Sequence, residues 1–394
     1  MRLFSGLNAA DARRELIRVG RNAPSPEEVE RLRRWATVKV TAPLGWGPFV
    51  AAFRDEILDV VGDPERGSAL VVFRAGNAAA LAERLGAGSG GGPLLGDLRA
   101  LIARYLRDGW RLTLPGGGVL VLDRPVLMGV VNVTPDSFSD GGRFLDPERA
   151  ASQALALHEA GAAIVDLGAE STRPGAEAVP AEAEWARLEP VLERLVDVPG
   201  LVLSVDTYKA DVARRCLERG AHLVNDISGL TLDPELADVA AEHGSPLVLM
   251  HIQGRPRTMQ EQPCYDDLMA EVMAFLERQG EAARRAGVAQ LVFDPGIGFG
   301  KTLDHNLELL RRLGELRALG VPLLLGPSRK SFIGKMTGAG PAERLPGTIA
   351  AVLQGMRAGA RVFRVHDVAE VHQAMRVWAA MGDGAKNGIF MQGR

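Results

Sequence analysis

Beyond residue 110 the chain repeats one pattern, in which a short apolar run without alternation is followed by a longer amphipathic stretch. Strands of a parallel sheet have this continuous apolar character because helices cover both faces of the sheet. The intervening stretches Pro147–Ala160, Tyr208–Arg219, Pro234–His243 and Leu303–Leu319 have the spacing of amphipathic helices. We therefore expect eight buried strands, at Val126–Val131, Ala163–Leu167, Leu201–Val205, His222–Val224, Pro246–Met250, Gln290–Phe293, Pro322–Leu325 and Val362–Val365.

The number of these units indicates the fold. Eight strand–helix units in about 275 residues fit a (β/α)8 barrel, or TIM barrel, which typically has about 250 residues. An open, doubly wound sheet is the alternative. It is less favoured, because no G-x-G-x-x-G motif follows the first strand and because eight units is the number that closes a barrel. The sequence predicts the α/β class and a (β/α)8 barrel.

The segment ahead of the barrel has a different pattern. Two alternating runs, Arg111–Leu114 and Val119–Leu122, flank three glycines and predict a β-hairpin. Residues 1–110 mix helical and strand patterns and predict a small α+β domain of unknown role, so residues 111–394 form the second domain. Within the first domain we expect helices near 9–18, 26–35, 47–60, 76–85 and 94–108, and strands at 38–41 and 70–73.

Composition excludes several classes of protein. Of 394 residues, 46% are hydrophobic and 24% charged, which excludes a disordered or collagen-like chain. The net charge of −3 gives no reason to expect a nucleic-acid or membrane-surface partner. Two unrelated cysteines, no apolar core near the start of the sequence and no long apolar run predict a cytoplasmic protein with free thiols. The chain has only six lysines and 40 arginines. We therefore expect some of the lysines to lie where a compact ammonium is needed and a guanidinium does not fit.

Polar side chains follow every one of the eight expected strands. Asp and Asn at such places are often helix N-caps, which is the alternative for any one of them. All eight strand ends are polar, however, and the chemistry of a barrel enzyme lies at the carboxyl ends of its strands. We therefore expect a ligand site made by Asn132, Glu170 to Arg173, Asp206, Asn225 with Asp226, His251, Asp294, Ser328 to Lys330, and Arg364 to His366.

The residue types divide this site into two halves. Asp206, Asn225, Asp294 and Lys330 offer acceptors and donors that suit a flat heterocycle with an amide-like edge. The other half is rich in cationic and hydroxyl donors, which suit phosphate oxygens. Together they predict a phosphorylated heterocycle as ligand. The phosphate half consists of Asn132, Thr172, Arg173, Arg364 and His366.

Two loops and a possible metal complete the expected site. The loops 132–142 and 170–176 carry Pro, Gly and short polar residues, and could reposition over a ligand. Residues 293–302 end in G-K-T but lack the first glycine of a phosphate-binding loop, so we expect their glycines to bring backbone close to a ring. The histidines show no zinc spacing, and a hydrogen-bonded rim residue is the equal alternative for His251. Magnesium is expected, bridging phosphate oxygens with one side-chain oxygen from Asn132.

Seven motifs, in order along the chain, resemble those of the dihydropteroate synthase family. The resemblance extends over roughly residues 111–385 and leaves the first 110 residues unexplained. No departure within the motifs suggests an inactive relative. The motifs are N-V-T-P-D-S-F-S-D-G-G at 132–142, D-L-G-A-E-S-T-R-P-G-A at 166–176, V-D-T-Y-K at 205–209, N-D-I-S-G at 225–229, F-D-P-G-I-G-F-G-K at 293–301, S-R-K-S-F at 328–332 and R-V-H-D at 364–367.

The resemblance implies a reaction of folate synthesis, in which 4-aminobenzoate joins hydroxymethyldihydropterin pyrophosphate to give dihydropteroate and pyrophosphate. It implies pterin contacts at Asp206, Asn225, Asp294 and Lys330, an aminobenzoate pocket at Ser328 and the two loops, and a homodimer through barrel helices. It also implies pyrophosphate contacts at Asn132 (with magnesium), Thr172, Arg173, Arg364 and His366.

We expect catalysis by electrostatic stabilisation, with Arg173, Lys330, Arg364 and His366 as the catalytic residues. Positive groups absorb the charge of departing pyrophosphate, the pterin methylene becomes cationic, and closed loops exclude water. Two rivals remain. A methyltransferase barrel that binds methyltetrahydrofolate would share the pterin pocket but need no pyrophosphate site, and a catalytically silent pterin-binding relative would keep the pocket alone.

Overall fold

The computed structural model describes residues 2–4, 7–19, 23–41, 52–53, 55, 57–62, 68–73, 75–86, 92–134, 146–171 and 178–381. The chain divides into two compact units. One consists of Met1–Asp108 with Gly314–Gly320, and the other of Gly109–Leu313 with Val321–Arg394.

The first unit contains an antiparallel sheet in the order β1-β2-β4-β3. Phe4, Leu16, Leu32 and Val72 share one apolar core, which joins the sheet to its first two helices. The strands are β1 (Arg2–Phe4), β2 (Thr37–Thr41), β3 (Ile57–Gly62) and β4 (Ser68–Phe73), and the helices are α1 (Ala9–Arg18), α2 (Pro26–Arg34), α4 (Ala78–Gly86) and α5 (Gly92–Leu106).

The expected helix at 47–60 is wrong at its end, because residues 57–60 belong to β3. Ile57 and Val60 are β-branched and pair with β4, so cross-strand packing prevails over the local helical spacing. The short strand β1 was not expected from the sequence. Its residues are buried where they pair with β2.

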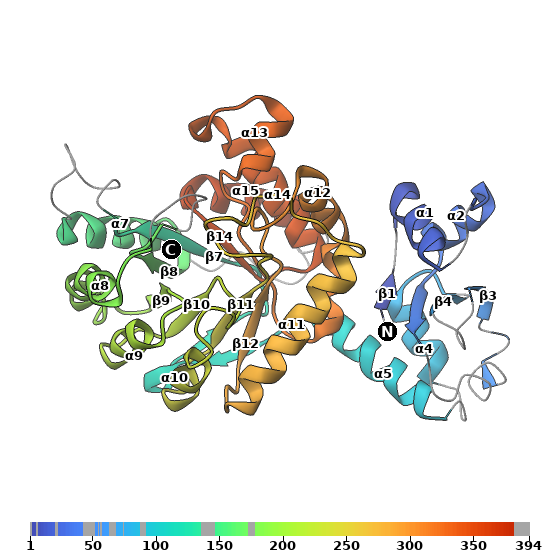
Figure 1. Cartoon of the computed structure of the whole chain (residues 1–394), viewed down its shortest axis with the longest axis horizontal. Coiled ribbons are helices and arrows are strands. Elements are labelled where there is room, and N and C mark those ends of the chain that lie inside the picture. Colours follow the sequence, from blue (N-terminus) through green and yellow to red (C-terminus); the bar gives the residue numbers. More distant parts are fainter. Residues whose placement is uncertain are drawn as a thin grey trace. The chain divides into compact units, whose positions relative to one another are not determined.

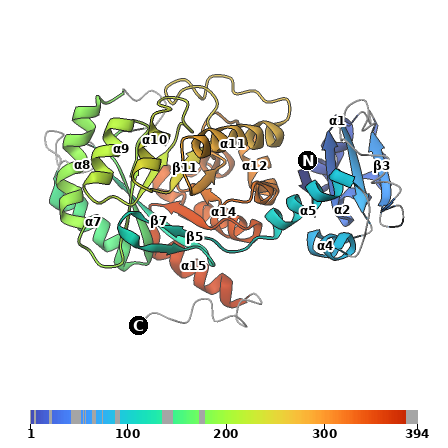
Figure 2. The ribbon, with the colours of Figure 1, turned by 90° about the horizontal axis from the view of Figure 1, so that it is seen from below.

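The second unit contains the eight-stranded parallel barrel that the apolar runs predict. The strands follow the order β12-β11-β10-β9-β8-β7-β14-β13, and a parallel bridge between Phe293 and Leu323 closes the ring. Helices surround the strands (Figures 1 and 2). The strands are β7 (Val126–Asn132), β8 (Ala162–Gly168), β9 (Val202–Asp206), β10 (Leu223–Asp226), β11 (Leu247–Met250), β12 (Leu291–Asp294), β13 (Leu324–Leu325) and β14 (Val362–Val365).

Each barrel helix buries one face and exposes the other. In α9, Val212, Ala213, Cys216 and Leu217 are buried, while the intervening charged residues pair with neighbouring helices. The expected helix at 303–319 ends at Arg312 and continues as a 3-10 turn. The helices are α7 (Pro147–Glu159), α8 (Ala181–Leu195), α9 (Ala210–Glu218), α10 (Leu236–Glu242), α11 (Leu268–Arg285), α12 (Leu303–Arg312), α13 (Ser331–Thr337), α14 (Leu345–Ala358) and α15 (Val368–Met381).

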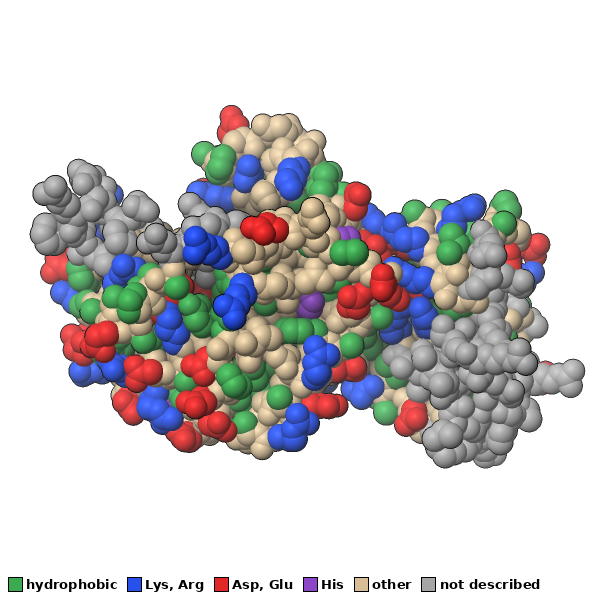
Figure 3. All heavy atoms as spheres, viewed as in Figure 1, with side chains coloured by type: hydrophobic (Ala, Val, Ile, Leu, Met, Phe, Trp, Pro, Cys, Tyr) green, Lys and Arg blue, Asp and Glu red, His purple; other side chains and the backbone are tan. Residues whose placement is uncertain are grey.

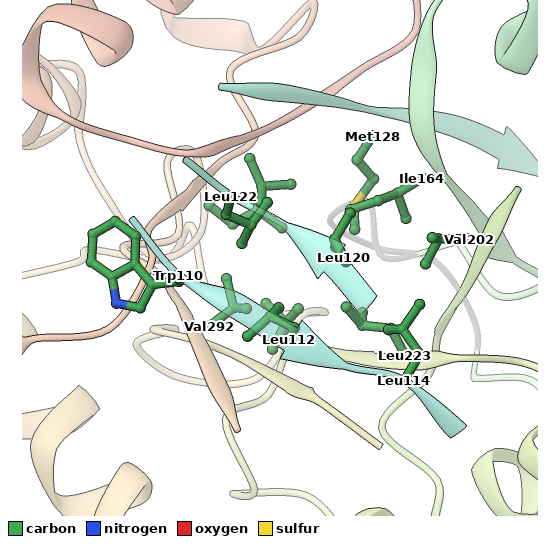
Figure 4. Packing of buried hydrophobic residues seen from close by; sticks show 13 residues of the cluster. Trp110, Leu112, Leu114, Leu120, Leu122, Met128, Ile164, Val202, Leu223 and Val292 are labelled. Atoms are coloured by element: carbon green, nitrogen blue, oxygen red, sulfur yellow. The ribbon is translucent and has the colours of Figure 1, made fainter. Parts of the chain in front are cut away.

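A hairpin precedes the barrel and fills its amino-terminal end. Strands β5 (Arg111–Thr113) and β6 (Val119–Val121) are joined by a turn in which Gly116 and Gly117 have φ of 80° and 91°, a conformation that favours glycine. The hairpin leucines pack against one apolar residue near the start of each barrel strand (Figure 4). These ring residues are Met128, Ile164, Val202, Leu223, Val248, Val292, Leu324 and Val362.

The surface agrees with the balanced composition. Acidic and basic side chains alternate over the visible face of the barrel and form no large patch of one sign (Figure 3). Among the described residues, no helix combines the length and apolarity needed to cross a membrane.

Candidate active site

The carboxyl ends of the barrel strands bring charged side chains from distant motifs together. Arg364, on β14, donates through Nε to Asp166 Oδ2 at 2.6 Å and through Nη2 to Asp206 Oδ2 at 2.7 Å. A Cβ atom at Gly326 would lie 3.8 Å from Arg364 Cβ and 4.0 Å from Asp294 Oδ2. Residues of the two predicted halves therefore meet at one mouth.

Asp166 is a residue of this cluster that the sequence analysis missed. Its side chain is fully buried and accepts hydrogen bonds from Ser204 Oγ at 2.5 Å and Asn225 Nδ2 at 2.9 Å, besides that from Arg364. The signal was a carboxylate inside an otherwise apolar strand, since an ionised group is buried only where partners compensate it. Asp166 thus orients both the arginine and the amide.

Of the two carboxylate oxygens of Asp206, one is hydrogen-bonded and the other has no hydrogen-bond partner among the described residues. Arg364 binds Oδ2, whereas Oδ1 is buried and has no hydrogen-bond partner among the described residues. Burial raises the pKa of Asp206 from 3.8 to about 7, although the Arg364 charge opposes the rise. A buried acceptor without a partner is costly, so this oxygen is suited to an N–H donor of a bound molecule.

Asp294 and Lys330 form a second part of the mouth. Asp294 Oδ1 accepts from the Gly296 backbone N–H at 2.7 Å, and burial raises the pKa of Asp294 to about 6. Burial also lowers the pKa of Lys330 to about 8, against the attraction of Asp294. The Lys330 ammonium lies 3.9 Å from the centre of the Phe299 ring, a cation–π contact that holds it at the mouth.

His366 is a neutral donor here. Ser328 Oγ accepts from the His366 backbone N–H at 3.1 Å and lies 2.9 Å from His366 Nδ1. The Ser328 hydroxyl can therefore donate a hydrogen bond to Nδ1, in which case the proton of the neutral imidazole is on Nε2. Burial, followed by the Arg364 charge, lowers the pKa of His366 to about 4. Near pH 7 His366 donates a hydrogen bond but carries no charge.

The alternative that the strand-end residues are helix caps is wrong for three of them. Helix α9 begins after Lys209, α10 after Glu235 and α12 after Thr302, and Thr302 makes a side-chain cap there. Asp206, Asn225 and Asp294 stand before these positions and turn to the mouth instead. His251 is the hydrogen-bonded rim histidine that we gave as an alternative, because its Nδ1 lies 2.9 Å from Lys301 Nζ.

A second buried ion cluster lies beside the mouth. Lys209 forms ion pairs with Glu170, after β8, and with Glu184 of α8. Tyr208 donates to Glu170 Oε1 at 3.0 Å. The cluster ties the end of β8 to two helices. The chain then continues toward Thr172 and Arg173, which lie outside the described residues, as do 135–142 and 173–176 of the two expected loops.

Comparison with known proteins identifies this arrangement. Residues 128–366 match the pterin binding enzyme family. The chain is 48% identical to the dihydropteroate synthase of Synechocystis sp. over 261 residues, which cover 66% of this chain and 90% of that protein. A Xanthomonas albilineans dihydropteroate synthase, solved with 4-aminobenzoic acid, has a TM-score of 0.64 at 48% identity and covers 68% of this chain and 97% of its own. The chain belongs to the dihydropteroate synthase family.

A further structure, that of Thermus thermophilus dihydropteroate synthase in complex with 6HMPPP, has a TM-score of 0.61 at 45% identity. The match covers 69% of this chain and the whole of the Thermus thermophilus chain. The barrel is therefore that of a dihydropteroate synthase, a transferase of folate biosynthesis.

The described residues of the chain supply only part of the donor set that the expected metal needs. No group of three or more His, Cys, Asp and Glu side chains suited to a metal occurs among the described residues. Asn132 ends β7, is half-buried and pairs with Gly168 in the sheet, so its amide is held at the mouth. One amide oxygen suits a hard cation that takes its other oxygen ligands from a diphosphate and water.

Proposed function

We propose that this mouth condenses 4-aminobenzoate with 6-hydroxymethyl-7,8-dihydropterin pyrophosphate, releasing pyrophosphate and 7,8-dihydropteroate. The observation that carries the proposal is the buried, unpartnered Oδ1 of Asp206 at the same mouth as Asp294 and Lys330. The relatives solved with 4-aminobenzoic acid and with 6HMPPP support it, because together they cover both substrate types.

The pterin ring is bound by groups of complementary hydrogen-bonding type. Asp206 and Asp294 accept from ring N–H and amino groups, Lys330 donates to a ring acceptor, and Asn225 does either. Asn225 is fixed in place, since its Nδ2 already donates to Asp166. A carboxylate acceptor makes each contact charge-assisted, which favours a base with adjacent donors.

The pyrophosphate leaves toward a fixed positive charge. Burial alone would lower the pKa of Arg364, but Asp166 and Asp206 raise it above its ordinary value, so the guanidinium stays charged. His366 adds a neutral N–H donor, and Thr172 and Arg173 are proposed as further contacts. These groups are in place before the reaction and stabilise the charge that develops on the leaving oxygens.

We propose magnesium as the cofactor, held by the Asn132 side-chain oxygen together with the substrate's diphosphate. When bound, the ion neutralises charge on the leaving group. Asn132, for its part, directs the diphosphate toward the β7 end of the mouth.

We further propose a cytoplasmic homodimer. Cys216 and Cys264 are free thiols, in keeping with a reducing compartment. Val377 and Met381 of α15 are exposed large hydrophobic side chains, which supports an interface between barrel helices of two copies.

The decisive experiment follows pyrophosphate release by the purified chain. Release that requires both dihydropterin pyrophosphate and 4-aminobenzoate, with dihydropteroate formed in equal amount, is the expected result. Binding of the pterin without release would instead favour the silent relative. Methyl transfer from methyltetrahydrofolate to a cobalamin acceptor would favour the methyltransferase.

We propose that residues 1–110 lie outside the catalytic machinery. The relatives cover 90% or more of their own length while matching about two thirds of this chain. A chain that begins at Gly109 should therefore keep kcat and both KM values within about threefold, a difference of under 1 kcal/mol. Steady-state kinetics of the two lengths checks this. A folded short chain that had lost turnover would place a catalytic contribution in the first unit.

A further inference from the structure

We propose that Lys301 is a positioning residue, whose ammonium fastens the loop after β12 to the neutral ring of His251 and so fixes Asp294 and Phe299 for pterin binding. The inference rests on the proposed function of this mouth. It assigns Lys301 no contact with substrate.

Lys301 is buried and its ammonium is surrounded by uncharged acceptors. Lys301 is only 2% exposed. Its Nζ lies 2.9 Å from Phe299 O, 2.9 Å from His251 Nδ1 and 3.4 Å from His251 O. Three N–H groups thus face three acceptors. Burial lowers the pKa of Lys301 to about 7, with Asp294 opposing and Lys330 assisting, so the ammonium with its three N–H groups is the form present below about pH 7.

His251 is fitted to act as the acceptor. Burial, followed by the Lys301 charge, lowers the pKa of His251 to about 2, so the ring is neutral. Because the Lys301 ammonium can only donate, its position 2.9 Å from Nδ1 makes Nδ1 the acceptor and leaves the ring proton on Nε2. The ring is held edge-on to Phe275 at 4.9 Å between centroids. Its orientation is therefore fixed by packing, and the ammonium has a defined partner.

Two glycines near Lys301 lie where the backbone leaves no room for a side chain. Gly296 and Gly300 have φ of +69° and +60°, and a Cβ atom would lie 1.9 Å from His251 O at Gly296 and 2.4 Å from Gln253 O at Gly300. A Cβ at Gly296 would also lie 3.3 Å from Lys301 Nζ. The loop thus closes over the ammonium and rests on the segment that follows β11.

Each group that Lys301 touches is next to a substrate-side contact. His251 donates its backbone N–H to Asp294 O at 2.9 Å, and Gly296 donates to Asp294 Oδ1 at 2.7 Å. Phe299, whose carbonyl accepts from Lys301, carries the ring that holds Lys330. One ammonium therefore sets the position of the carboxylate and of the aromatic support for the second lysine.

A lysine suits this place better than the arginine that the chain uses elsewhere. The three acceptors converge on one nitrogen, as a compact ammonium requires, whereas a guanidinium spreads its donors over a planar fork. This requirement explains why a lysine is kept at position 301 in a chain that otherwise uses mostly arginine.

The test compares Lys301→Met with Lys335→Met, the same change at an exposed lysine of α13. Loss of a charge-assisted hydrogen-bond centre should weaken hydroxymethyldihydropterin binding by about tenfold or more, measured by calorimetry on folded full-length protein. The KM for 4-aminobenzoate should change by less than about threefold. The Lys335 variant should match the wild type.

If Lys301→Met does not fold, a second pair of variants, at His251, tests whether the contact between Lys301 and His251 supports pterin binding. His251→Leu removes the ring acceptor, while His251→Asn keeps an acceptor near Nδ1. We expect Leu to weaken pterin binding by about tenfold and Asn to restore most of it. Wild-type pterin affinity in the folded Leu variant, or in folded Lys301→Met, would overturn the inference. Failure of the unaltered enzyme to bind any pterin would instead reject the proposed function.

Discussion

Replacing Asp294 with asparagine should weaken pterin binding by about 10- to 150-fold, the effect of losing about 1.5–3 kcal/mol from charge-assisted hydrogen bonds. The amide keeps the shape of the side chain and can still accept from Gly296 N–H through one oxygen. What it lacks is the negative charge and the second acceptor. Titration calorimetry with hydroxymethyldihydropterin measures the change.

The pH dependence of binding separates charge from shape. Burial raises the pKa of Asp294 from 3.8 to about 6, so the carboxylate is charged above that pH. The part of the affinity that depends on Asp294 should be present above about pH 6 and lost as the pH drops through it. The Asp294→Asn variant should lose this part and keep the pH dependence of Asp206, whose pKa is about 7. Asp304→Asn, an exposed change on α12, is the control. Equal pterin affinity in wild type and Asp294→Asn would contradict the assignment.

Replacing Arg364 with methionine should lower the free energy of unfolding of the barrel by about 3–5 kcal/mol and abolish measurable turnover. Asp166 is fully buried and Asp206 nearly so, and both lose their cationic partner. One-sided removal of a buried pair leaves uncompensated charge, which costs more than the pair itself contributes. Urea denaturation, followed by circular dichroism, measures the loss.

Arg219→Met is the matched control for this change. The Arg219 side chain is 50% exposed and pairs with Glu189 at 2.8 Å. Exposed pairs contribute little, so we expect a loss under about 1 kcal/mol and unchanged kinetics. If the two variants lost the same stability, Arg364 could not be the partner on which the buried carboxylates depend.

The barrel was predictable from the sequence because its signal is local. A strand covered on both faces shows a continuous apolar run, whatever its neighbours are. The eight runs match the observed strands to within one or two residues at each end. Of the described residues that follow them, Asp206, Asn225, Asp294, Lys330 and Arg364 lie at the mouth. By contrast, β3 is an edge strand whose sequence I-L-D-V-V-G has two apolar pairs around one aspartate and does not alternate, so its pattern also fits a helix.

The hydrogen bonds and ion pairs within the site were not predictable from the sequence, because they join residues that are far apart in the chain. Asp166 is bound by residues 38, 59 and 198 positions away in the chain, so nothing near it in sequence shows why a carboxylate is buried there. Arg364 was assigned to the phosphate half, yet it pairs with Asp206 of the ring half. The two halves share this arginine, which residue types alone could not show.

The leucines of the β5–β6 hairpin determine where a shortened enzyme should start. The family match begins at residue 128, yet Leu112, Leu114, Leu120 and Leu122 cover the ring of apolar residues at the feet of all eight strands. A chain beginning at residue 126 would keep the whole mouth and uncover that ring, and exposed apolar patches of this kind promote aggregation. The shortest chain that stays soluble should therefore include the β5–β6 hairpin, and so begin before the segment that matches the family.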